Sequence, residues 1–134
     1  YDMGDYFGHW LEMGKNIPNP PKIFHVNWFR TDADGHFIWP GFGDNMRVLL
    51  WILARCEGKV DARETAIGYV PYAKDINIEG LDITEDTVNE LLSVDNEAWL
   101  ADVENIKEFY DMIGGTVPCE LREELSALKA RLSK

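Results

Sequence analysis

The sequence predicts an α+β fold that is rich in helices. Apolar and polar residues alternate before residue 40, an apolar run fills residues 48–54, and three later segments carry apolar residues at helical spacing behind a capping residue. We therefore expect a β-hairpin at about 23–39, a helix at about 45–57, and three further helices at about 85–93, 96–113 and 118–132.

The hairpin is predicted from two short alternating runs joined by a turn. Residues 1–13 suggest a short helix that Gly14 ends, and the three prolines within Asn16–Pro21 then break the chain. Ile23–Phe29 alternates as a strand does, Asp32–Gly35 has the composition of a turn, and His36–Trp39 returns as the second strand.

The next helix follows a loop of glycine and proline. Asp44 or Asn45 can cap it, and Gly58 ends it. Its residues are apolar on nearly every side, which predicts a central, buried helix.

The last helices have clear start and stop signals. Thr84 and Asp95 can cap two of them, after an extended piece at 67–70, and Pro118 suits the first turn of the last one. The last helix carries a leucine stripe, which we interpret as core rather than as a docking face: Leu121, Leu125, Leu128 and Leu132.

Composition limits the possible functions. The 134 residues suffice for one compact domain, and a net charge of −11 argues against a nucleic-acid-binding surface. The longest apolar run, Val48–Ala54, is too short to span a membrane. Cys56 and Cys119 lie far apart in the sequence and are expected to be buried thiols of a cytosolic protein.

Catalytic and metal-binding signatures are missing from the sequence. It contains no GxxxxGK[ST] loop, HExxH, CxxC or GxSxG. Asp32 and Asp34 resemble the start of a calcium loop, but Gly43 stands where the bidentate glutamate belongs. Neither the acidic clusters nor the histidines have catalytic or metal-ligand spacing, so we predict no catalytic residue and no metal ligand: Glu123–Glu124, Asp82, Glu85, Asp86, His9, His25 and His36.

The one unusual segment is aromatic, with six aromatic residues between positions 24 and 42. Phe24 and Trp28 fit a hairpin core, whereas the others flank the turn and the glycine-rich loop. Aromatic rings on loops can stack on a planar base, and such stacking contributes roughly 1–3 kcal/mol per base. Asp44 and Asn45 are expected to present free N–H groups, and the Asn45 amide can read the edge of a base.

The same segment resembles the guanine-binding region of GTP-dependent phosphoenolpyruvate carboxykinases. The resemblance rests on NWFR at Asn27–Arg30, WPGFGDN at Trp39–Asn45 and RVLLWI at Arg47–Ile52. The lead-in (Met3–Tyr6) is similar, and similarity that is less specific continues to the C-terminal end, with the strongest match at residues 22–58.

The resemblance implies that Phe29, Phe37 and Phe42 enclose the guanine and that Asn45 reads its edge. The surrounding residues would support the pocket: Trp28, Trp39, Gly41, Gly43 and Asp44. The family is a cytoplasmic, generally monomeric lyase that converts oxaloacetate and GTP to phosphoenolpyruvate, GDP and carbon dioxide in gluconeogenesis or anaplerosis, with Mn²⁺ or Mg²⁺.

The family's phosphate-binding loop, metal ligands, oxaloacetate-binding arginine and lid would all lie upstream of Tyr1. Residues 1–134 are therefore expected to be one helix-rich piece of the C-terminal nucleotide-binding domain of an α/β enzyme, with the guanine pocket at 22–58 and a helical segment at 59–134. We expect the piece to be inactive alone, to partner the upstream remainder of its enzyme, and to form only artefactual oligomers. The alternative is a stand-alone binding or interaction module, with the aromatic cluster as core or as a protein-docking patch.

Overall fold

The computed structural model describes residues 1–134 as two compact units. One unit joins Tyr1–Pro21 to Val94–Lys134, and the other is the intervening Lys22–Ser93. Helices make up most of the regular structure and a single two-stranded sheet accompanies them, so the predicted α+β class is confirmed. None of the helices is both long and apolar enough to cross a bilayer.

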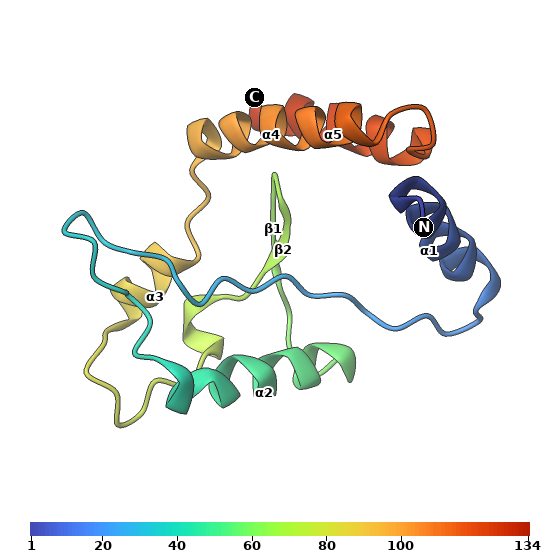
Figure 1. Ribbon diagram of the computed structural model, residues 1–134. Coiled ribbons are helices and arrows are strands. Elements are labelled where there is room, and N and C mark those ends of the chain that lie inside the picture. Colours follow the sequence, from blue (N-terminus) through green and yellow to red (C-terminus); the bar gives the residue numbers. More distant parts are fainter. The chain divides into compact units, whose positions relative to one another are not determined.

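The first unit is helical and consists of α1 (Met3–Asn16), α4 (Asn96–Ile113) and α5 (Cys119–Leu132). Helices α4 and α5 run side by side as a hairpin (Figure 1). Asp95 caps α4 by accepting bonds from two backbone N–H groups, as predicted. Val103 and Leu132 are each 2% exposed, which confirms that the leucine stripe contributes to the core.

Helix α1 is held to this unit through its first turn. The Asp2 carboxylate caps the helix at the Gly4 N–H and also accepts from the Thr116 hydroxyl at 2.8 Å. Gly4 is buried so closely against Thr116 that a Cβ at this position would overlap the Thr116 backbone. The predicted N-terminal helix is confirmed, but its predicted end at Gly14 is wrong, because the helix continues to Asn16. The glycine at position 4 makes the close approach possible.

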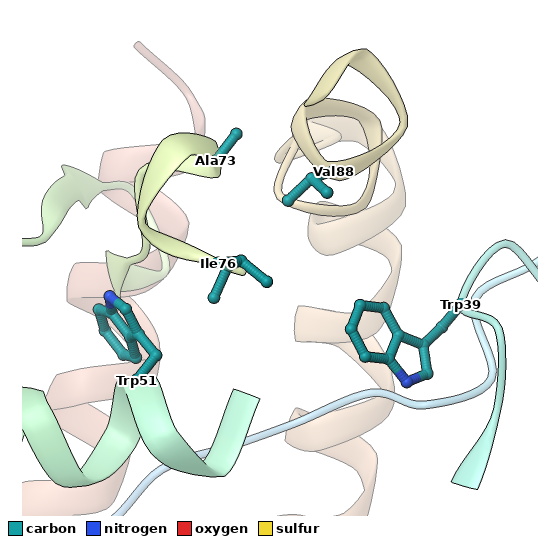
Figure 2. Packing of buried hydrophobic residues seen from close by; sticks show 5 residues of the cluster. All are labelled: Trp39, Trp51, Ala73, Ile76 and Val88. Carbon is teal, nitrogen blue, oxygen red and sulfur yellow. The ribbon is translucent and has the colours of Figure 1, made fainter. Parts of the chain in front are cut away.

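The second unit contains short elements around one apolar cluster. In chain order they are η1 (Phe42–Asp44), α2 (Asn45–Cys56), β1 (Arg63–Thr65), β2 (Gly68–Val70), η2 (Ala73–Asp75) and α3 (Glu85–Leu91). Strands β1 and β2 are antiparallel, with Glu64 opposite Tyr69. Trp39, Trp51, Ala73, Ile76 and Val88 meet in the core, as Figure 2 shows.

Helix α2 lies where it was predicted, but the prediction that it is buried is wrong for this chain. Only Trp51 is buried, while Met46, Leu50 and Leu53 are 55%, 58% and 56% exposed. The core cluster covers one face of the helix, with Val48 and Ile52 packed at its margin. Met46, Leu50 and Leu53, on the opposite face, remain more than half exposed.

The predicted hairpin at 23–39 is wrong as a pair of strands. The turn is present, with the Asp32 N–H bonded to the His36 carbonyl at 2.9 Å, but pairing is limited to one bridge between Thr31 and Phe37. Residues 21–28 run without regular structure. Phe24 and Trp28 still pack against the core, so these two side chains are partly buried as predicted. The segment forms no strand because no neighbouring strand pairs with it.

The two cysteines are free thiols, and both are exposed. The prediction that they are buried is therefore wrong. Cys56 ends α2 at the unit's surface, and Cys119 begins α5, where its side chain faces the Glu120 carboxylate.

Candidate functional site

The site that the sequence predicts is built on two tryptophans. Trp39 is 6% exposed, and Trp28 is half-buried with its ring centroid 6.4 Å from that of Trp39. The Arg30 carbonyl accepts the Ile38 N–H at 3.0 Å. This bond joins the chain before the turn to the chain after it, next to the two tryptophans. The tryptophans thus form the floor of the aromatic segment and link it to the core.

Phe29 and Phe37 lie together beyond this floor. Their ring centroids are 5.9 Å apart and their planes meet at 63°, so the rings touch edge to face. They remain 71% and 64% exposed, which is unlike core residues. No gap for a base lies between these two rings in this arrangement, since parallel rings around a base stand about 7 Å apart, or two contact distances.

Phe42 is separated from the other two phenylalanines. It begins η1, is 93% exposed, and makes no ring contact with Phe29 or Phe37. Gly41 precedes it with φ +130°, a backbone conformation that favours glycine. The loop therefore projects Phe42 into solvent, between two residues that carry no side chain.

The backbone N–H groups at the start of α2 are not free, contrary to the prediction. The Asp44 N–H bonds to the Gly41 carbonyl at 3.1 Å, and the Asn45 N–H bonds to the Phe42 carbonyl. The 3₁₀ turn η1 consumes both donors as it leads into the helix. Any ligand here must use side chains rather than these two amides.

Asn45 is the polar side chain that bonds to the aromatic floor. Its carbonyl oxygen Oδ1 accepts the Trp39 indole N–H at 2.9 Å, and the residue is half-buried. Asp44 is the N-cap residue of α2, as predicted, but its side chain makes no capping hydrogen bond to the helix. The Asp44 carboxylate instead binds the Arg47 guanidinium, with Nε and Oδ1 3.0 Å apart.

Arg47 was not predicted as part of the site, yet it braces it. Its guanidinium donates to the Asn77 carbonyl at 2.9 Å and to the Glu79 carbonyl at 3.0 Å, in addition to the Asp44 carboxylate. One side chain therefore ties the loop before α2 to a segment thirty residues further along. Only its place in the RVLLWI motif could have indicated this role from the sequence. Its partners include backbone carbonyls, which every residue carries, so the sequence does not identify them.

An open cleft of about 430 Å³ runs along one side of α2. Of the predicted site residues, only Gly43 and Asp44 line it, together with Arg47, Asp75 and Asn77 among others. Trp51 also lines this cleft, and its buried indole N–H has no hydrogen-bond partner. The cleft is distinct from the exposed phenylalanines and does not enclose them.

Asp32, Asp34 and His36 bring three potential metal donors within 4.8 Å of one another, although the spacing of the histidines alone predicted no such group. All three are exposed. One Asp32 oxygen already accepts the Asp34 and His36 N–H groups at 2.9 Å each, and the His36 bond is the main reason that the pKa of Asp32 lies below its usual range. These contacts account for the clustering of the three side chains as part of a turn.

The similarity to known proteins includes the aromatic segment and extends over nearly the whole chain. The family profile described as the phosphoenolpyruvate carboxykinase C-terminal P-loop domain matches residues 1–131. A GTP-dependent phosphoenolpyruvate carboxykinase of Renibacterium salmoninarum is 51% identical over 134 residues, and one of Treponema pallidum is 48% identical over 136 residues. These matches cover 98% and 99% of this chain but only 22% of each relative.

Proposed function

Because the chain belongs to the family of GTP-dependent phosphoenolpyruvate carboxykinases, we propose that it supplies the guanine-binding side of such an enzyme. The reaction is the reversible conversion of oxaloacetate and GTP to phosphoenolpyruvate, GDP and carbon dioxide. The chain spans 22% of the length of the relatives it matches. That the whole protein catalyses this reaction is therefore part of the proposal.

The observation that carries the proposal is the exposure of three phenylalanines in the same segment as an oriented amide. Phe29, Phe37 and Phe42 are between 64% and 93% exposed, although large apolar side chains are usually buried. Asn45 follows Phe42 by three residues and is held by the buried Trp39. Exposed rings and a half-buried amide provide stacking and edge recognition, the two interactions that bind a base selectively.

Binding of the base requires the rings to move. Phe29 and Phe37 contact each other edge to face, so at least one must rotate to expose a face to the guanine. Phe42 can approach from the glycine-flanked loop, since nothing lies within 4 Å of a Cβ placed at Gly41 or Gly43. The site is supported from the core by the ring contact between Trp28 and Trp39. It is also supported by Asp44, which is held by the Arg47 guanidinium.

No chemical step is assigned to this chain. Its sequence lacks a GxxxxGK[ST] loop for the phosphates, and its only close group of metal donors serves a turn. We propose that residues 1–134 act with the remainder of a cytoplasmic, monomeric carboxykinase, and that the Mn²⁺ or Mg²⁺ ligands and reacting groups come from that remainder. Within the chain we assign residues 22–58 to the guanine pocket and 59–134 to a helical segment.

The alternative, a binding or interaction module, is favoured by one observation. Met46, Leu50 and Leu53 expose an apolar face on α2, separate from the phenylalanines. A partner protein that covers this face would not need the amide of Asn45.

Nuclear magnetic resonance of the labelled chain separates the two functions. Millimolar GTP should shift the ring signals of Phe29, Phe37 and Phe42 and the side-chain amide of Asn45, while α1, α4 and α5 stay unchanged. Affinity should be weak, because the phosphates have few contacts here. Shifts confined to other residues, or no shift at all, would reject the base-binding assignment.

A further inference from the structure

The contact between Trp39 and Asn45 determines how the Asn45 side chain is turned. An indole nitrogen can only donate, so the atom 2.9 Å from the Trp39 Nε1 must be the amide oxygen. The two amide orientations of an asparagine are otherwise hard to distinguish. Here the chemistry of the partner selects one of them.

Trp39 is itself held firmly. It is 6% exposed and packs in the core cluster with Ile76 and Val88. Figure 2 shows its benzene ring directed toward these residues and its nitrogen on the edge that faces away from Val88. A buried indole N–H usually has a hydrogen-bond partner, and for Trp39 this partner is Asn45. The core therefore fixes the indole, and the indole fixes the amide.

The Asn45 backbone is also fixed. Its φ and ψ are helical, at −59° and −29°, and its N–H bonds to the Phe42 carbonyl. With backbone and amide oxygen both engaged, the remaining hydrogen-bonding group is the amide nitrogen, which has two donors. That nitrogen points away from Trp39, because it lies opposite the bonded oxygen across the amide.

We propose that Trp39 is a positioning residue for base selection, acting through Asn45 and resting on the proposed guanine site. Guanine carries a carbonyl oxygen at position 6, which accepts from an amide N–H, whereas adenine carries an amino group there, which does not. An amide free to rotate could offer its oxygen to adenine. The Trp39 hydrogen bond prevents this rotation and so makes Asn45 selective.

The test compares dissociation constants for GTP and ATP in the carboxykinase that carries this chain. Trp39→Phe removes the indole N–H and keeps an aromatic ring in the core. We expect the preference for GTP over ATP to fall about tenfold, which corresponds to roughly one hydrogen bond. Asn45→Ala should reduce the preference as well, and Trp39→Phe should have no additional effect in the Asn45→Ala background.

Trp28→Phe is the matched control. Trp28 packs against Trp39 but does not bond to Asn45, so its substitution should change both affinities together and leave their ratio unchanged. If Trp39→Phe does not fold, benzothienylalanine at position 39 keeps the size and shape of the indole while replacing the N–H with sulfur. The same loss of selectivity is then expected.

The outcomes distinguish the inference from the function on which it rests. Equal affinity of the unaltered enzyme for GTP and ATP would overturn the proposed guanine site. A preference that Asn45→Ala removes and Trp39→Phe preserves would overturn only the positioning role. An equal fall in the ratio of GTP to ATP affinity in Trp28→Phe would also overturn the positioning role. The loss would then come from disturbing the packing of the two tryptophans, and not from the bond between Trp39 and Asn45.

Discussion

At the scale of single residues, burial separates the aromatic side chains by role. Phe24 contacts the buried Trp51, with ring centroids 6.3 Å apart and perpendicular planes, and belongs to the core. Phe42 is 93% exposed and contributes almost nothing to folding. Its place between two glycines has no structural purpose within this chain, so a ligand accounts for it best.

Phe42→Ala should therefore weaken nucleotide binding without weakening the fold. Loss of one stacking partner removes roughly 1–3 kcal/mol, which lowers GTP affinity by about 5-fold to about 150-fold. Thermal unfolding should be nearly unchanged. Phe24→Ala is the opposite control, because deleting a largely buried phenylalanine costs about 3–5 kcal/mol at most and should lower stability. A GTP affinity that survives Phe42→Ala would contradict the role assigned to this ring.

At the scale of elements, the helices follow local signals and the irregular segments do not. Thr84 and Asp95 cap α3 and α4 as predicted, because capping involves residues two or three positions apart. The hairpin and the burial of α2 were not predicted correctly, since both depend on what lies beside the element. The Trp39–Asn45 and Arg47–Asn77 bonds could not be read from spacing at all, because they depend on rotamers and on distant backbone.

The docking of α1 depends on the absence of a side chain at Gly4. A methyl group there would overlap the Thr116 backbone, and the Thr116 side chain is also tied to the helix through Asp2. Gly4→Ala should destabilise the helical unit by about 1–3 kcal/mol, the usual cost of overpacking, although alanine is the better helix former. Gly14→Ala is the control, since a methyl group at position 14 would have no neighbour within 4 Å. Chemical denaturation of both variants measures the difference, and equal stability would contradict the close packing of α1.

At the scale of the whole molecule, excess negative charge is partly organised into ion pairs between helices. The Arg122 guanidinium, followed by the Lys107 ammonium, holds the pKa of Asp111 below its usual range, and Lys129 does the same for the pKa of Glu104. Both carboxylates are exposed, so each pair contributes modestly and is screened by salt. They add to an α4–α5 contact that apolar packing already provides.

These lowered pKa values give the stability a defined pH dependence. A carboxyl group whose pKa is lower in the folded chain stabilises the fold fully above its ordinary pKa, and that contribution is lost as pH falls through the folded value. The helical unit should therefore lose stability below about pH 4, where unpaired carboxyl groups begin to protonate. Asp111→Asn should flatten this dependence, and circular dichroism between pH 7 and pH 2 measures it. If the Asp111→Asn variant loses stability at the same pH as the original chain, the ion pair of Asp111 does not cause the pH dependence.

The central claim is that residues 29–45 recognise guanine, and the most direct measurement is the ratio of GTP to ATP affinity in the proposed full-length enzyme. We predict a clear preference for GTP, which Asn45→Ala largely abolishes, because this substitution removes the amide that distinguishes guanine from adenine. Equal binding of GTP and ATP by the unaltered enzyme would contradict the claim.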